Sequence, residues 1–309
     1  MGGPHTDDEL DTLLAGGRLG AAAKDRVEEQ LLAGAARPTR RRRRQALAIT
    51  VVVVLVVIAG VLLLWRVAAA ADATTAAGGR PDGFVDLAEV APSIDVDMRY
   101  ATARNFVGRP IRGYRAGRCL LARPAAQALA EVARDLTPSG LGLRVYDCYR
   151  PRRAVADFVA WARDVTDTAT RAVHYPDVPK AELFKRGYIA HRSGHSRGAT
   201  VDLTLIPLPA PPRGDGGAAA APTTAAGDCR VLAGPRAPDG SLDMGTAFDC
   251  FDERSNTDDP RVTPAARRNR DLLRSAMQKR GFANYAREWW HFTLADEPFP
   301  DTAFDFEVR

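Results

Sequence analysis

The feature that most restricts the fold is a long apolar run without a charged residue. It extends over 20 residues, from Ala46 to Trp65. As a helix that rises ~1.5 Å per residue, this run would span the ~30 Å hydrocarbon core of a bilayer. A surface helix of a globular domain keeps a polar face, which this run lacks. The sequence therefore predicts a transmembrane helix over residues 46–65.

The charges beside this run predict its orientation. Arg37 and Arg40 to Arg44 precede it, whereas only Arg66 follows closely. Because cytoplasmic flanks are rich in arginine and lysine, we expect a cytoplasmic basic tail over 1–45 and an extracytoplasmic remainder. The chain would then be a single-pass protein of the cytoplasmic membrane. A cleaved signal peptide is the alternative, although the run exceeds the ~7–15 apolar residues usual in such peptides.

The rest of the chain divides into a linker and one sizeable domain. Residues 66–82 are rich in alanine and glycine, which is typical of a linker. A chain of 309 residues with 46% hydrophobic content can bury a full core even after an anchor is subtracted. We expect the domain to cover 83–309, with a surface insertion over 206–241 that is dense in proline, glycine and alanine.

The charge balance argues against a nucleic-acid partner. The formal net charge is +5, and six positive charges belong to Arg37 and Arg40 to Arg44, which leaves about −1 for the rest. Four cysteines, Cys119, Cys148, Cys229 and Cys250, lack the paired spacing of a structural zinc site. Disulfides remain open, and a Cys229–Cys250 bridge is favoured because both residues lie near the insertion.

Periodicity predicts helices and strands in an α+β arrangement with a mainly antiparallel sheet. The expected helices are 123–135, 152–165 and 264–279, and the expected strands are 141–146 and 199–206. In the second strand, Val201, Leu203 and Leu205 share one face, which we assign to the core. Asp202 lies on the opposite face, which can hold chemistry.

Two separated motifs supply a set of metal-ligating side chains. The first, SGHSRGATVD, joins His195 in a glycine-flanked turn to Asp202 in the following strand. The second, EWWH, places Glu288 three residues before His291. Two imidazoles and one carboxylate leave a fourth tetrahedral position open, as at a catalytic zinc. The sequence therefore predicts one Zn²⁺, held by His195, Asp202 and His291.

Hydrolysis of an amide also requires a proton carrier and a cation. Glu288 is the candidate general base and acid, which takes a proton from water and delivers it to the leaving nitrogen. Arg150, in VYDCYRP, is suited to stabilise the negative intermediate. Glu288 and His291 are three residues apart, which places them on one face of a helix but on opposite faces of a regular strand. If the segment is a strand, a turn or irregular backbone must lie between them for both to face one site.

The chain resembles the VanX-type D-alanyl-D-alanine dipeptidases in four motifs, SGHSRGATVDLTL, LDMGTAFDCFDERS, EWWHF and YDCYRP. The resemblance extends from about Val85 to the C-terminus. It implies the fold of D-Ala-D-Ala peptidases and hedgehog-like zinc peptidases, and a hydrolase of D-alanyl-D-alanine in peptidoglycan metabolism. It assigns the same zinc ligands, a catalytic role to Glu288 and transition-state stabilisation to Arg150.

The same resemblance implies how the dipeptide is bound. Asp249 would pair with its free ammonium, and Ser193 matches a serine that the family uses near the substrate. Two alternative functions remain open. Asp249 argues against a D,D-carboxypeptidase or endopeptidase that acts on stem peptides, because those peptides have no free amine at this point. Glu288 and Arg150 argue against a non-catalytic zinc module that binds wall fragments.

The other histidines are not expected to bind metal. His5 lies in the N-terminal tail, whereas His174 and His191 lie in polar loop sequence. Trp289 and Trp290 are expected to pack in the core on opposite sides of the chain, rather than to form a stacking platform.

Overall fold

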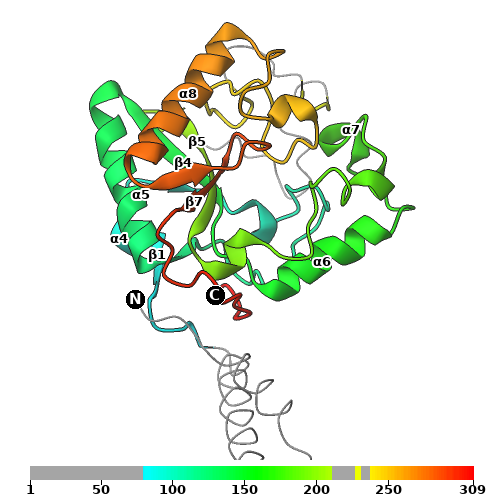
Figure 1. The fold of residues 1–309 in the computed structure, drawn as a ribbon, viewed down its shortest axis with the longest axis horizontal. Helices are drawn as coiled ribbons and strands as arrows, with labels where there is room; N and C mark the ends of the chain where they lie inside the picture. Colours follow the sequence, from blue (N-terminus) through cyan, green and yellow to red (C-terminus); the bar gives the residue numbers. More distant parts are fainter. Residues whose placement is uncertain (1–78, 211–226, 231–236) are drawn as a thin grey trace, which may run out of the picture. The chain divides into compact units, whose positions relative to one another are not determined.

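The computed structural model describes residues 79–210, 227–230 and 237–309, and these form two sheets with surrounding helices (Figure 1). The strands are β1 (Phe84–Asp86), β2 (Asp95–Val96), β3 (Leu120–Ala122), β4 (Leu141–Asp147), β5 (Thr200–Pro207), β6 (Phe282–Asn284) and β7 (His291–Leu294). The helices are α4 (Leu87–Val90), α5 (Arg123–Leu136), α6 (Arg152–Arg163), α7 (Arg171–His174) and α8 (Pro264–Lys279). The 3-10 helices are η1 (Arg99–Ala101), η2 (Thr137–Ser139), η3 (Lys180–Glu182), η4 (Gly194–Arg197) and η5 (Glu253–Ser255). The predicted α+β class is confirmed.

The larger sheet has the strand order β2-β4-β5-β7-β6. Its β4–β5, β5–β7 and β6–β7 pairs are antiparallel, whereas β2 runs parallel to β4. The sheet is therefore mainly antiparallel, as predicted, but it is mixed because it contains one parallel pair. β2 contributes only two residues, Asp95 and Val96, so it is too short to show the alternation that reveals a strand. β1 and β3 form a separate antiparallel pair.

Helices α5 and α8 contact each other and the larger sheet, and Figure 1 shows them together on one side of its strands. α8 begins at Pro264, where the missing N–H of proline has no intrahelical partner to lose. The Thr263 hydroxyl caps this end by accepting a hydrogen bond from the N–H of Ala266. Leu273 and Met277 then turn inward and are fully buried. The predicted helix over 264–279 is confirmed.

β5 carries alternating side chains to two different environments. Val201, Leu203 and Leu205 join the hydrophobic core, as predicted. The opposite face, which includes Asp202 and Thr204, is also buried. A buried polar face needs partners for its polar atoms. The β5 face around Asp202 is therefore suited to bind specific polar partners rather than bulk solvent.

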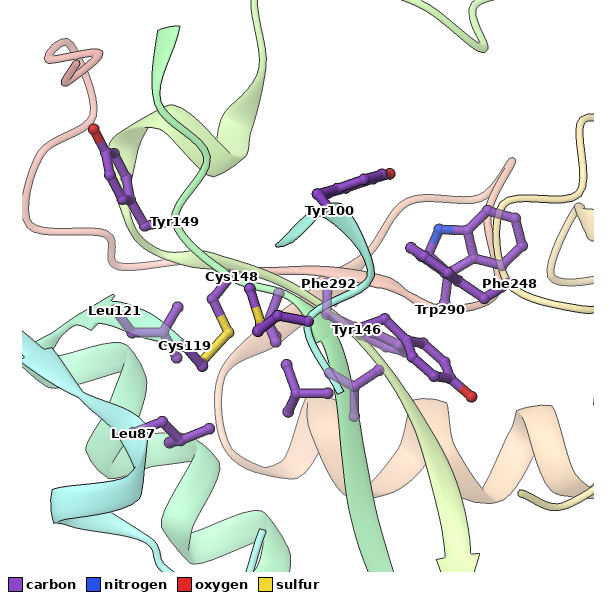
Figure 2. Close-up of a cluster of buried hydrophobic side chains, with 14 of the residues drawn as sticks. Leu87, Tyr100, Cys119, Leu121, Tyr146, Cys148, Tyr149, Phe248, Trp290 and Phe292 are labelled. Carbon is purple, nitrogen blue, oxygen red and sulfur yellow. A yellow bond between two sulfur atoms is a disulfide. The ribbon is translucent and has the colours of Figure 1, made fainter. Parts of the chain in front are cut away.

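Both pairs of cysteines form disulfides. The favoured Cys229–Cys250 bridge is confirmed, and a second bridge, Cys119–Cys148, was not predicted. Figure 2 shows the second bridge among buried side chains that include Leu121. It joins the residue before β3 to the residue after β4, so it constrains the backbone that leads to Arg150.

The predicted location at a membrane is corrected. Residues 46–65, together with the predicted basic tail over 1–45, lie outside the described residues. Within the part of the chain that the structure describes, no helix has the length and apolar character to cross a membrane.

Candidate active site

The turn that presents His195 has strict local requirements. The Ser193 hydroxyl caps η4 by accepting a hydrogen bond from the His195 N–H, at 3.3 Å. The turn ends at Gly198, whose φ of 82° lies in the left-handed region that favours glycine. A Cβ at Gly198 would also collide with the Phe84 ring. The predicted glycine-flanked turn is confirmed, and the His195 side chain points into the interior, where it is buried.

The three predicted ligands come together because of the sheet register. Asp202 on β5 and His291 on β7 are direct cross-strand partners. Such partners on antiparallel strands place their Cβ atoms ~4.5–5.5 Å apart. Asp202 Oδ1 lies 3.0 Å from His291 Nδ1 and 3.2 Å from His195 Nε2, and these two nitrogens are 3.3 Å apart. The three side chains form a group that could hold a metal ion.

The surroundings of this group fit a metal ion. His195 Nδ1 donates a hydrogen bond to the Cys148 carbonyl at 2.7 Å, which leaves Nε2 as the free electron-pair donor. Asp202 Oδ1 is buried and has no hydrogen-bond partner among the described residues. Buried carboxylate oxygens normally have such a partner. An unpaired oxygen beside two imidazole nitrogens is the donor set of a metal centre.

Glu288 reaches the same point through a turn. It lies between β6 and β7, and the His291 N–H donates to the Glu288 carbonyl at 3.2 Å. This turn places the side chains of Glu288 and His291 on the same side of the chain. The prediction that a regular strand does not join the two residues is consistent with it. Glu288 Oε2 lies 3.5 Å from His291 Nδ1. Burial raises the pKa of Glu288 to about 7, so its carboxyl group can exchange a proton near neutral pH.

Arg150 is held as a cation next to the group. Its guanidinium donates to Asp147 Oδ2 at 2.9 Å through Nε and lies 2.8 Å from it through Nη2. Nη2 is also 3.6 Å from Asp202 Oδ2. Burial opposes the charge, but Asp147 and other neighbours raise the pKa of Arg150 above its ordinary value. Arg150 Cζ lies over the Tyr100 ring, 5.1 Å from its centroid.

Asp249 presents a buried carboxylate from a constrained backbone. Its φ of 56° is the one positive value at a non-glycine residue among the described residues. Such strain persists where surrounding contacts fix it, often at a functional site. The Tyr100 hydroxyl lies 2.9 and 3.1 Å from the two carboxylate oxygens. Burial raises the pKa of Asp249 well above its usual range, so a cationic ligand would be needed to stabilise its charged form.

One cavity of about 300 Å³ unites the predicted site residues. Its lining includes Arg150, Ser193, Asp202, Asp249, Glu288 and His291. His195 is buried behind this lining and contacts Asp202. The volume is at the lower end of the range for ligand cavities, which indicates a small ligand. Trp289 and Trp290 are core residues, as predicted, and Figure 2 shows Trp290 beside Phe248 in the buried cluster. Trp290 also lines the cavity.

Comparison with known proteins places this geometry in a family. A family described as D-ala-D-ala dipeptidase matches residues 80–209 and 225–309. The chain belongs to the D-ala-D-ala dipeptidase family. A D-alanyl-D-alanine dipeptidase of Streptomyces coelicolor is 42% identical over 225 residues, which cover 73% of this chain and 96% of that protein. Similar dipeptidases from Enterococcus faecalis and Enterococcus faecium are 37% and 35% identical, each over 74% of this chain and 98% of the relative.

Two residues of this family member's cavity region were not predicted from sequence. Tyr100 contacts Asp249 from η1, and Asp147 contacts both Arg150 and His195 Nδ1. Asp147 lies three residues before Arg150 in YDCYRP, and this spacing could have identified it as the arginine's partner. Tyr100 carried no such local indication, because its partner is 149 positions away.

The other described histidines are not part of the His195–Asp202–His291 group. His174 contacts the Asp249 carbonyl and His191 stacks on Phe184, with ring centroids 4.9 Å apart. His5 lies outside the described residues.

Proposed function

We propose that this chain hydrolyses D-alanyl-D-alanine to two D-alanine molecules, with one Zn²⁺ per domain, as part of peptidoglycan metabolism. The observation that carries the proposal is one small cavity that holds a His-Asp-His group, a buried glutamate and a buried aspartate. The relatives named as D-alanyl-D-alanine dipeptidases support the choice of substrate.

Zinc is the proposed metal because of donor type and spacing. Two imidazole nitrogens and one carboxylate oxygen are common zinc ligands, and three protein ligands are typical of catalytic sites. Donor atoms ~2.0–2.1 Å from a tetrahedral zinc lie roughly 3.3 Å from one another. The separations of 3.0, 3.2 and 3.3 Å among His195, Asp202 and His291 agree with this value. When bound, zinc supplies Lewis-acid chemistry at the scissile amide.

Glu288 is proposed as the residue that moves the proton. Its carboxylate accepts a proton from the attacking water and delivers it to the nitrogen of the leaving D-alanine. A pKa of about 7 suits both steps, because the group then gains and loses a proton with similar ease near neutral pH. Burial in the cavity wall is the main cause of this value.

Arg150 is proposed to stabilise the negative charge that develops on the carbonyl oxygen. The ion pair with Asp147 fixes the guanidinium before substrate arrives, so little reorganisation is needed when charge develops. A further contact, with the Ser193 hydroxyl at 3.5 Å, connects Arg150 to the serine that is predicted to lie near the substrate.

Asp249 is proposed to bind the ammonium group of the dipeptide. A buried carboxylate is stabilised by a cation, and a buried ammonium needs an anion, so each offsets the desolvation of the other. The Tyr100 hydroxyl orients the carboxylate. An acylated amine carries no positive charge to pair with Asp249, and its acyl group would have to fit beside this buried carboxylate. Both points argue against action on stem peptides.

The test is release of D-alanine by the zinc-loaded protein from D-alanyl-D-alanine and from its N-acetyl derivative. We expect release from the free dipeptide alone, and a large rise in KM in Asp249→Asn. Asp271→Asn, a partly exposed aspartate on α8, serves as the matched control. Release mainly from the acetylated compound would indicate a carboxypeptidase. Release from neither would indicate a module that binds without catalysis.

A further inference from the structure

A second, larger cavity adjoins the catalytic one. It measures about 810 Å³ and lies along α6, the loop 191–197 and the C-terminal segment 300–305. Arg192, Ser193 and Val155 line both cavities, so the two lie next to each other. We call the larger one the arginine groove, because its lining includes Arg152, Arg153, Arg163, Arg192 and Arg197.

The arginine groove carries positive charge that its own lining does not neutralise. Arg153 pairs with Asp305 at 3.0 Å, and Arg197 pairs with Glu297 at 2.8 Å. The other three arginines of the lining are Arg152, Arg163 and Arg192, and all three are exposed. Their side chains have no ion pair or hydrogen bond with the described residues. A concave surface with an excess of one charge attracts ligands of the opposite charge.

The contacts in the catalytic cavity indicate which end of a substrate faces this groove. Asp249 contacts the Tyr100 hydroxyl, the Tyr100 ring lies beneath Arg150, and Arg150 contacts the Ser193 hydroxyl. This series runs from Asp249 to Ser193, which also lines the arginine groove. If the ammonium group is bound at Asp249, the leaving residue points toward Ser193 and Arg192.

We propose that the arginine groove selects D-alanyl peptides whose leaving residue carries an additional carboxylate, such as D-alanyl-D-glutamate. This inference rests on the proposed function, because it uses the binding of the amine at Asp249. Water is added across the amide bond: the hydroxyl goes to the D-alanyl carbonyl carbon and the proton to the leaving nitrogen. The products are D-alanine and D-glutamate. Arg192 binds the side-chain carboxylate, since its planar guanidinium matches that group.

The helix geometry limits which arginines take part. Arg152 and Arg163 are eleven positions apart on α6, which corresponds to ~16 Å along the helix axis. A single glutamate side chain cannot bridge that length. Arg192, at the junction of the two cavities, is therefore the residue whose charge should determine the selectivity.

The experiment compares kcat/KM of the full-length, zinc-loaded chain for D-alanyl-D-alanine, D-alanyl-D-glutamate and D-alanyl-D-glutamine. Glutamate and glutamine side chains have nearly the same shape, so their ratio isolates charge. We expect a ratio of about ten, which corresponds to ~1.4 kcal/mol. It should fall toward one in Arg192→Gln and at high salt. Arg268→Gln, an exposed arginine on α8, is the matched control and should keep the ratio.

The possible outcomes separate this inference from the proposed function. A ratio of one in the wild-type protein, or an equal loss for all three peptides in Arg192→Gln, would overturn the acidic selectivity while D-alanyl-D-alanine hydrolysis stands. If no peptide is hydrolysed, the proposed function fails. In that case, calorimetric binding measurements still test the charge selectivity of the groove. D-glutamate should bind more tightly than D-glutamine to the wild-type protein, but not to Arg192→Gln. Equal binding of the two would overturn the inference.

Discussion

Acidification is expected to destabilise the protein through His174. The His174 Nδ1 donates a hydrogen bond to the Asp249 carbonyl at 3.1 Å, so the ring holds the backbone that presents the Asp249 carboxylate. The backbone around it is fixed further by the Phe251 N–H, which donates to the His174 carbonyl at 2.7 Å. Burial lowers the pKa of His174 to about 4.

The sign and size follow from linkage between protonation and folding. In the unfolded chain the pKa of His174 is ~6.5. Above this pH, His174 is neutral in the folded and the unfolded states, so its titration does not change the free energy of unfolding. As the pH falls from ~6.5 toward 4, the unfolded chain takes up a proton that the folded protein does not, so the free energy of unfolding falls. The difference between the two pKa values corresponds to roughly 3 kcal/mol at most. Below pH 4 the loss levels off.

The assay is urea unfolding of the metal-free protein at several pH values between 7 and 4, followed by tryptophan fluorescence. His174→Asn is the comparison, because its amide can donate a similar hydrogen bond but does not titrate. The difference in unfolding free energy between the two proteins should change by roughly 3 kcal/mol over this range. Since other groups titrate alike in both proteins, a difference that stays constant with pH would refute the reasoning.

Three further predictions concern the metal, the disulfide and the arginine. Chelation is expected to lower Tm, with recovery on addition of zinc, because the metal binds only the folded arrangement; a Tm indifferent to zinc would contradict the metal centre. Replacing Cys119 and Cys148 by serine, across a separation of 29 residues, is expected to lower the free energy of unfolding by about 3–4 kcal/mol, and an unchanged urea midpoint would oppose this. Arg150→Lys is expected to lower kcat by roughly 10²–10³-fold with little change in KM, whereas a loss confined to KM would assign Arg150 to substrate binding.

The local elements were predictable where the residues themselves impose the structure. Thr263 and Pro264 start α8, and the glycine at 281, with φ of 84°, follows its end. The alternation in β5 likewise placed Asp202 on the polar face. The motifs also identified the three side chains that the structure brings into one group, His195, Asp202 and His291, because each motif carried a local pattern with a chemical meaning.

Long-range pairings could not be predicted in the same way. Nothing near Tyr100 indicates a contact with Asp249, because that contact depends on how η1 packs across the cavity. The Cys119–Cys148 bridge depends on β3 lying near the end of β4, and sequence spacing does not reveal this proximity. The turn that aligns Glu288 with His291 was required by the chemistry, but only the fold shows its form.

The most direct test of the central claim is the activity of Glu288→Gln with D-alanyl-D-alanine. Zinc content and Tm should match those of the wild-type protein, and Glu131→Gln, a partly exposed glutamate on α5, is the control. We expect kcat to fall by roughly 10²–10⁴-fold in Glu288→Gln, and to be unchanged in the control. Wild-type kcat in a zinc-loaded Glu288→Gln protein would contradict the assignment of this cavity as the catalytic site.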